Sequence, residues 1–133
     1  MTFEELDQRY PNGFDDAEIT SIAISYRTRT AAIELNLRGQ QPESSASQIY
    51  RPGLLTIQGF YYFSIEPPDI DHLHQTARPL IQVDGLSEDP REFPLFERVK
   101  PNLPAGAFSC RLFVHDWNSF IHIAARDAQF SWT

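Results

Sequence analysis

The chain has 133 residues but only one cysteine, Cys110, and no long run of apolar residues. A single cysteine excludes an internal disulfide framework and a zinc site built from several cysteines. Cys110 alternates with Phe108 and Leu112, so we expect it to point inward, where its thiol is inert. No window approaches the ~18 consecutive apolar residues of a membrane span, so we expect no membrane contact. Motifs of the GxGxxG, P-loop and G-x-S-x-G types are absent, and we expect no cofactor.

Basic residues are also scarce, because 18 Asp and Glu stand against 11 Lys and Arg and give a net charge of −7. Nucleic acid is therefore a poor partner, since binding to it depends on neutralising phosphates with Lys and Arg. The N-terminus is acidic where a secretory signal would be basic and then apolar, which together with the free cysteine indicates the cytoplasm. A chain of this length, with 13% aromatic residues, fits one domain over residues 1–133.

The acidity concentrates between Ser64 and Glu97, where eight acids and two bases give a net charge of −6. Such a field steers a basic partner toward the surface, although the simpler alternative is that it only keeps the protein soluble. The acids that we expect to steer a partner are Asp69, Asp71, Asp84, Glu88, Asp89 and Glu92.

Apolar residues recur at every second position over most of the chain, which predicts strands. The expected strands cover residues 22–26, 33–37, 54–66, 80–83, 108–114, 120–125 and 128–132. A capping box, Thr2-Phe3-Glu4-Glu5, predicts one short helix over 3–9, and irregular stretches predict loops over 39–48 and 87–104. With seven or eight strands, the sequence predicts an all-β domain, built as an antiparallel sandwich or a partly closed barrel.

Gly59 predicts a bulge or a sharp bend inside the stretch 54–66. The alternating residues of one face are Leu55, Ile57, Gly59, Tyr61, Phe63 and Ile65. The run Phe60-Tyr61-Tyr62-Phe63 puts aromatic rings on both faces, so either both faces are covered or one is an exposed contact patch. We favour covered faces, with Tyr61 or Tyr62 as the aromatic anchor if a patch exists.

Three carboxylates, Asp15, Asp16 and Glu18, lie just before the first expected strand. Clustered carboxylates hold a hard cation, or raise one another's pKa enough for acid–base work. The alternative, which we favour, is that Asp15 or Asp16 accepts backbone hydrogen bonds in the turn at Asn12-Gly13.

Histidines form two further candidate sites. His115 and His122 lie on the two arms of the expected C-terminal hairpin beside Asp116, where they could bind zinc or act as an acid–base couple. His72 and His74 alternate within the acidic segment and could chelate a metal if they lie on a strand. Structural or solvated histidines are commoner than ligands, so we expect no metal at either place.

The stretch from Tyr10 to Ile19, Tyr-Pro-Asn-Gly-Phe-Asp-Asp-Ala-Glu-Ile, leads into an alternating strand. It resembles the opening of a group of small bacterial all-β proteins that begin with a short helix, a Phe-His-Asp-Ala-Glu motif and a hairpin. Some of these are classed as immunity proteins of polymorphic toxin systems (the immunity protein 50 type), and many are uncharacterised. Asp15 stands where that motif has His, and the resemblance covers roughly the first 37 residues. It implies a toxin domain as the partner, neutralised by occlusion of its active site.

Together these features predict a cytoplasmic, non-enzymatic domain that binds another protein, such as a basic toxin. One alternative is a small-ligand-binding barrel in which His115 and His122 orient the ligand. A less favoured one is a metal-dependent enzyme that uses the histidines together with Asp15, Asp16 and Glu18. Exposed edge strands would in addition allow a homodimer.

Overall fold

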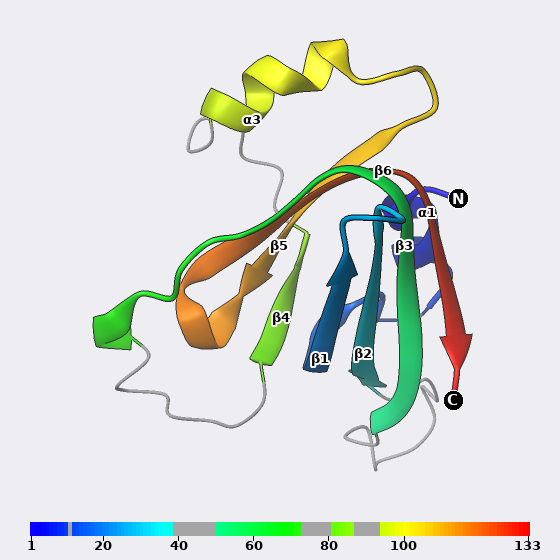
Figure 1. The fold of residues 1–133 in the computed structure, drawn as a ribbon. Coiled ribbons are helices and arrows are strands. Elements are labelled where there is room, and N and C mark those ends of the chain that lie inside the picture. The colour runs from blue at the N-terminus through cyan, green and yellow to red at the C-terminus, as the bar shows by residue number, and fades with distance from the viewer. Residues whose placement is uncertain (11, 39–49, 73–80, 87–93) are drawn as a thin grey trace.

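The fold is mostly β, with one antiparallel sheet and several short helices (Figure 1). The computed structural model describes residues 1–10, 12–38, 50–72, 81–86 and 94–133. The strands are β1 (Asp15–Ser25), β2 (Thr30–Arg38), β3 (Tyr50–Ile65), β4 (Ile81–Leu86), β5 (Phe108–Val114) and β6 (Ser119–Trp132). The helices are α1 (Phe3–Gln8), α3 (Pro94–Val99) and the short 3-10 turns η2 (Lys100–Asn102) and η3 (His115–Trp117). None of the helices in the described ranges is long and apolar enough to cross a membrane.

The strands form one continuous sheet in the order β1-β2-β3-β6-β5-β4. The five longer strands curl into a half-barrel, and the short β4 pairs with β5 on one side and with β1 on the other. The predicted barrel is therefore confirmed in outline, whereas the predicted sandwich of two packed sheets is wrong. The described residues form six strands instead of seven or eight, because β6 continues without a break through positions that the pattern divided into two strands.

The two predicted hairpins are confirmed. β1 and β2 pair antiparallel up to Ser25 opposite Thr30, and β5 and β6 pair up to Val114 opposite Ser119. In β2 the alternating residues Ile33, Leu35 and Leu37 are all buried. The period-two pattern therefore identified the inward face of this strand correctly.

The long strands β3 and β6 bend together over one end of the barrel (Figure 1). Gly59 has a φ of 62°, and the register with β6 shifts between Phe60 and Tyr62. The extra residue of such a bulge exchanges the two faces of a strand. Phe60 and Phe63, three residues apart, are therefore both buried. The bend at Gly59 is confirmed, but the alternation predicted beyond it is wrong, since Tyr61 is 38% exposed.

The predicted N-terminal helix is confirmed with its capping box. The Thr2 side chain accepts a hydrogen bond from the Glu5 N–H, and the Glu5 carboxylate accepts one from the Thr2 N–H. Phe3 and Leu6 are buried where α1 packs against β5 and β6. The Phe3 ring lies 4.8 Å from that of Phe14, so the helix joins the aromatic part of the core.

The predicted loop over 87–104 is wrong in part, because residues 94–102 form α3 and η2. The Phe96 ring of α3 lies 5.2 Å from the Tyr62 ring and stacks on the His122 ring at 3.8 Å. This helix therefore covers the outer face of β3 and β6, which period-two reasoning about the strands could not reveal.

The turn after α1 depends on a glycine. Gly13 has a φ of 54°, and a Cβ added there would lie 2.4 Å from Oδ1 of Asp7. The same Asp7 oxygen accepts a hydrogen bond from the Phe14 N–H at 2.8 Å. We expect Gly13→Ala to lower the free energy of unfolding by about 2–3 kcal/mol, because it adds backbone strain and displaces this acceptor. Urea unfolding measures the change.

Gly106→Ala is the matched control, since Gly106 also has a positive φ, of 86°, but its added Cβ would meet no atom within 4 Å. Backbone strain alone predicts a loss of about 1 kcal/mol there. Equal losses in the two variants would show that the contact with Asp7 contributes nothing.

Candidate functional site

Two acidic segments that are distant in sequence meet in the sheet. Asp15 at the start of β1 is the register partner of Asp84 in β4, and Glu18 is the partner of Gln82. Asp15 is exposed. The fold thereby places the start of β1 beside β4, the strand that carries Asp84. We call the region around Asp15 and Asp84 the acidic side. The other predicted acids Glu88, Asp89 and Glu92 lie outside the described residues.

Within the stretch Asp15-Asp16-Ala17-Glu18, a contact to the neighbouring strand holds Asp16. Asp16 has a φ of 60°, and its Oδ2 lies 2.5 Å from Nη1 of Arg38 on β2. The carboxylate that accepts the Phe14 N–H in this turn belongs to Asp7, seven residues earlier, and no spacing pattern indicates this contact. Asp16 thus serves an ion pair across the hairpin.

Asp69 ties the end of β3 to the turn between β5 and β6. Its carboxylate accepts hydrogen bonds from the side-chain amide of Asn118 at 3.3 Å and from the Asp71 N–H at 3.1 Å. The bond from Asn118, followed by that from the His72 N–H, holds the pKa of the Asp69 carboxyl below its usual value. Asp71 is exposed beside it.

The structure does not bring His115 and His122 into one site. His115 lies in η3 and is exposed, and its carbonyl oxygen lies 2.8 Å from Nε2 of His72. His122 is fully buried on β6, with Nε2 at 2.7 Å from a Glu66 carboxylate oxygen. His74, the second member of the other predicted pair, lies outside the described residues.

No three His, Cys, Asp or Glu side chains within the described ranges are close enough together to hold a metal ion.

In the aromatic run on β3, one of the two tyrosines is covered and the other is exposed. Tyr62 is half-buried beneath Phe96, and burial, followed by the nearby Cys110 and Glu97, raises the pKa of its hydroxyl. Tyr61 in the bulge is exposed, with the Arg29 guanidinium 5.3 Å from the centre of its ring. Tyr61 is therefore the available anchor and Tyr62 is a packing residue.

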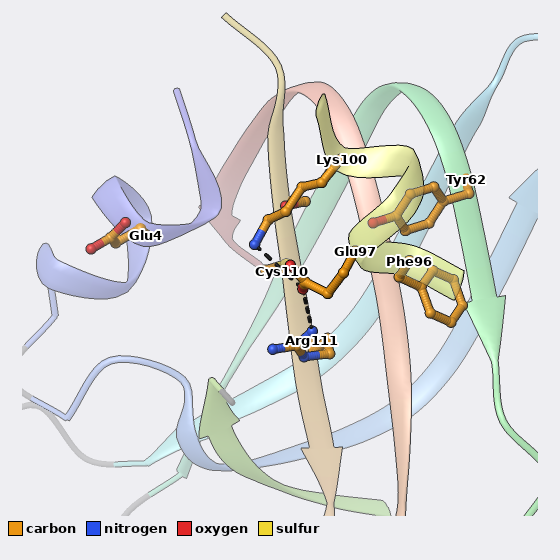
Figure 2. A pocket seen from close by; sticks show the side chains of 8 residues that line it. Glu4, Tyr62, Phe96, Glu97, Lys100, Cys110 and Arg111 are labelled. Atoms are coloured by element: carbon orange, nitrogen blue, oxygen red, sulfur yellow. Dashed lines mark hydrogen bonds and ion pairs between the residues drawn. The ribbon is translucent and has the colours of Figure 1, made fainter. Parts of the chain in front are cut away.

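A hollow of about 360 Å³ lies between α1 and the α3–η2 segment, over β5 (Figure 2). Glu97 forms its centre, because one of its carboxylate oxygens lies 3.0 Å from Nη1 of Arg111 and 3.7 Å from Nζ of Lys100. Glu4 lines the hollow from α1, with its carboxylate turned away from the other labelled side chains (Figure 2). The sequence pattern did not point to this cluster, since its members come from three separate elements.

The hollow offers no activated nucleophile among its described lining residues. Burial raises the pKa of the Cys110 thiol, which keeps it protonated and inert at neutral pH. Arg111 and Lys100 both already face the Glu97 carboxylate. The arrangement fastens α3 to the barrel and does not resemble an acid–base site.

Comparisons with known proteins assign no family. No protein-family model and no curated protein matches the chain. The crystal structure of an uncharacterized protein from Neisseria gonorrhoeae is similar at 13% sequence identity and a TM-score of 0.42, over 88% of this chain and 91% of that one.

The ion pair under α3 generates a prediction about stability. The Arg111 side chain is only 8% exposed, so removing the Glu97 carboxylate weakens a largely desolvated ion pair. We expect Glu97→Gln to lower the free energy of unfolding by about 1–3 kcal/mol. Lys100→Gln, which removes the half-exposed partner of the same carboxylate, should change it by less than about 0.5 kcal/mol. Urea unfolding measures the free energy of unfolding of both variants. A larger loss for Lys100→Gln than for Glu97→Gln would contradict the assignment of Arg111 as the main partner of Glu97.

The Asp69 carboxyl generates a prediction about pH. Asn118→Gly removes the amide donor while keeping the left-handed backbone, with its φ of 48°, that Asn118 adopts. We expect the pKa of Asp69 to rise in this variant toward the ordinary value of about 3.9. Because the folded pKa is lowered, the stabilisation is present above the unfolded pKa and is lost as pH falls through the folded one.

An NMR titration of the Asp carboxyl carbons measures this shift. Asp127 is the internal control, since its pKa is lowered by its own hydrogen bond with the Met1 amino group. An unchanged Asp69 midpoint would show that Asn118 does not stabilise the carboxylate.

Proposed function

We propose that this protein is a non-enzymatic domain that binds a basic partner protein through its acidic side. The observation that carries the proposal is the pairing of Asp15 with Asp84, which joins two acidic stretches of sequence on neighbouring strands. Acidic residues on neighbouring strands contribute to one negative field, and such a field speeds the approach of a positively charged partner.

The interior of the barrel favours this role over that of a small-ligand binder. Ile33, Leu37, Ile57, Ile121 and Ile123 are fully buried and fill the inside of the sheet. A ligand-binding barrel needs an internal cavity lined by a few polar groups. The hollow at Glu97 lies beneath α3 and is lined by paired charges.

The contacts of the candidate metal ligands favour a binding role over metal-dependent catalysis. Asp16 is engaged by Arg38, and His122 is engaged by Glu66 and covered by Phe96. A cation at either place would have to compete with these contacts.

A toxin domain is the partner that the N-terminal resemblance to the immunity protein 50 type suggests. Nuclease toxins bind phosphates and are often basic, so an acidic inhibitor complements their charge and occludes the active site. Under this proposal the protein acts in the cytoplasm, where such a toxin would otherwise do damage.

The test compares two variants that raise the net charge by the same amount. Asp15→Asn with Asp84→Asn alters the acidic side, and Glu4→Gln with Glu34→Gln alters acids elsewhere. The probe is the product of a toxin-sized reading frame beside this gene, mixed by stopped flow at low ionic strength. We expect the first variant to associate about 3- to 10-fold more slowly and with a weaker salt dependence, and the second to change by less than about 2-fold.

Equal slowing in both variants would show that only net charge matters, and an unchanged rate in the first would reject the acidic side. Failure of the probe to bind the wild-type protein would reject the toxin as partner.

A further inference from the structure

The end of the β1–β2 hairpin carries exposed aromatic and basic side chains in an otherwise acidic protein. Tyr26 is 75% exposed and Tyr61 is 38% exposed. Arg27, Arg29 and Arg126 are exposed as well. We call these five residues the arginine–tyrosine tip. Asp15 lies at the other end of the 11-residue strand β1, roughly 30 Å away at the usual rise per residue.

The tip is held in place by contacts to β3. The Phe60 N–H donates a hydrogen bond to the Arg29 carbonyl oxygen at 3.0 Å, and Arg29 itself has a φ of 55°. The Arg29 guanidinium then lies over the Tyr61 ring, and the Tyr26 ring meets the Phe60 ring edge-on at 6.0 Å. The rings and the guanidinium are therefore ordered before any partner arrives, which lowers the entropic cost of binding.

Gly59 brings the third arginine to the same place. A Cβ added to Gly59 would lie 3.2 Å from Cβ and 3.4 Å from Nε of Arg126. Because Gly59 has no side chain, Arg126 lies across β3 next to Phe60, the residue whose N–H binds the β1–β2 turn. Gly59 therefore both bends the sheet and makes room for Arg126 on the surface.

Acidic residues in the same segments do not neutralise the positive charge of the tip. Residues 26–29 and 59–61 contain no acid, and Asp127, next to Arg126, holds the Met1 amino group. Guanidinium groups bind carboxylates in a two-pronged geometry, and Arg and Tyr are the residue types most enriched at binding hot spots. Charge complementarity therefore indicates an acidic occupant.

We propose that the arginine–tyrosine tip binds a carboxylate-rich segment of a partner protein. The same residue types also bind single-stranded nucleic acid, by stacking and phosphate contacts. Three arginines offer few phosphate contacts to a nucleic acid, whereas one guanidinium is enough to hold one carboxylate in the two-pronged geometry. This surface is separate from the acidic side and does not depend on the function proposed for it.

The test is an NMR titration of the full-length ¹⁵N-labelled protein with a deca-glutamate peptide at low salt. We expect amide shifts confined to residues 25–30, 58–62 and 125–127. Arg29→Gln with Arg126→Gln should weaken binding about 10-fold, because it removes two charge-assisted contacts. Arg9→Gln with Arg98→Gln, which removes two exposed arginines elsewhere, should weaken it less than about 2-fold.

Each other outcome overturns the proposal. Absent or scattered shifts would show that the tip does not bind carboxylates. Equal weakening of peptide binding in the two arginine variants would show that only the net charge of the protein matters. Tighter binding of a ten-residue oligothymidylate would assign the tip to nucleic acid. Sedimentation showing self-association that the Arg29 and Arg126 variant abolishes would assign it to a second copy of the chain. The Asp15 and Asp84 variant should retain peptide binding, which separates this test from that of the acidic side.

Discussion

β3 and β6 pair from Gly53 opposite Trp132 to Ile65 opposite Ile121, and the rest of the structure depends on the way this long pair bends. The bulge at Gly59 bends β3 and β6, and the strands beyond the bend return toward β1. The short strand β4 is therefore enough to join β5 to β1. The bend also leaves an outer face on β3 and β6 that α3 covers. Phe96 seals it by stacking on the buried ring of His122.

Closure of the sheet gives the molecule two contrasting ends. Because β4 lies beside β1, Asp15 and Asp84 are register partners on neighbouring strands. Because β3 bulges beside the β1–β2 turn, Arg29 and Tyr61 gather at the opposite end. The interior of the barrel is filled by buried apolar side chains. Each of the six described strands has a neighbour on both sides, and the expected homodimer stays a prediction.

The candidate site was predictable only where its residues are neighbours in sequence. Tyr61 and Tyr62 were both candidate anchors because the aromatic run is continuous, but the arginine neighbours of Tyr61 come from a turn and from β6. His115 and His122 were a candidate pair that we did not favour, and the hairpin register indicated their strands but not that Phe96 packs over His122. The Glu97–Arg111 pair gave no signal, since α3 lies in a stretch with several prolines and no periodicity.

Local physics in the sequence determined the capped helix α1, the two hairpins, the bend at Gly59 and the excess of acid in one segment. Each depends on residues within a few positions of one another, whose preferences act before any long-range contact forms. Tertiary structure alone decided that the sheet closes, which side of β3 faces inward beyond the bulge, and which charges meet. A one-residue bulge reverses the two faces of a strand, and β4 joins β1 across more than 60 residues of chain, so neither outcome is encoded in local periodicity.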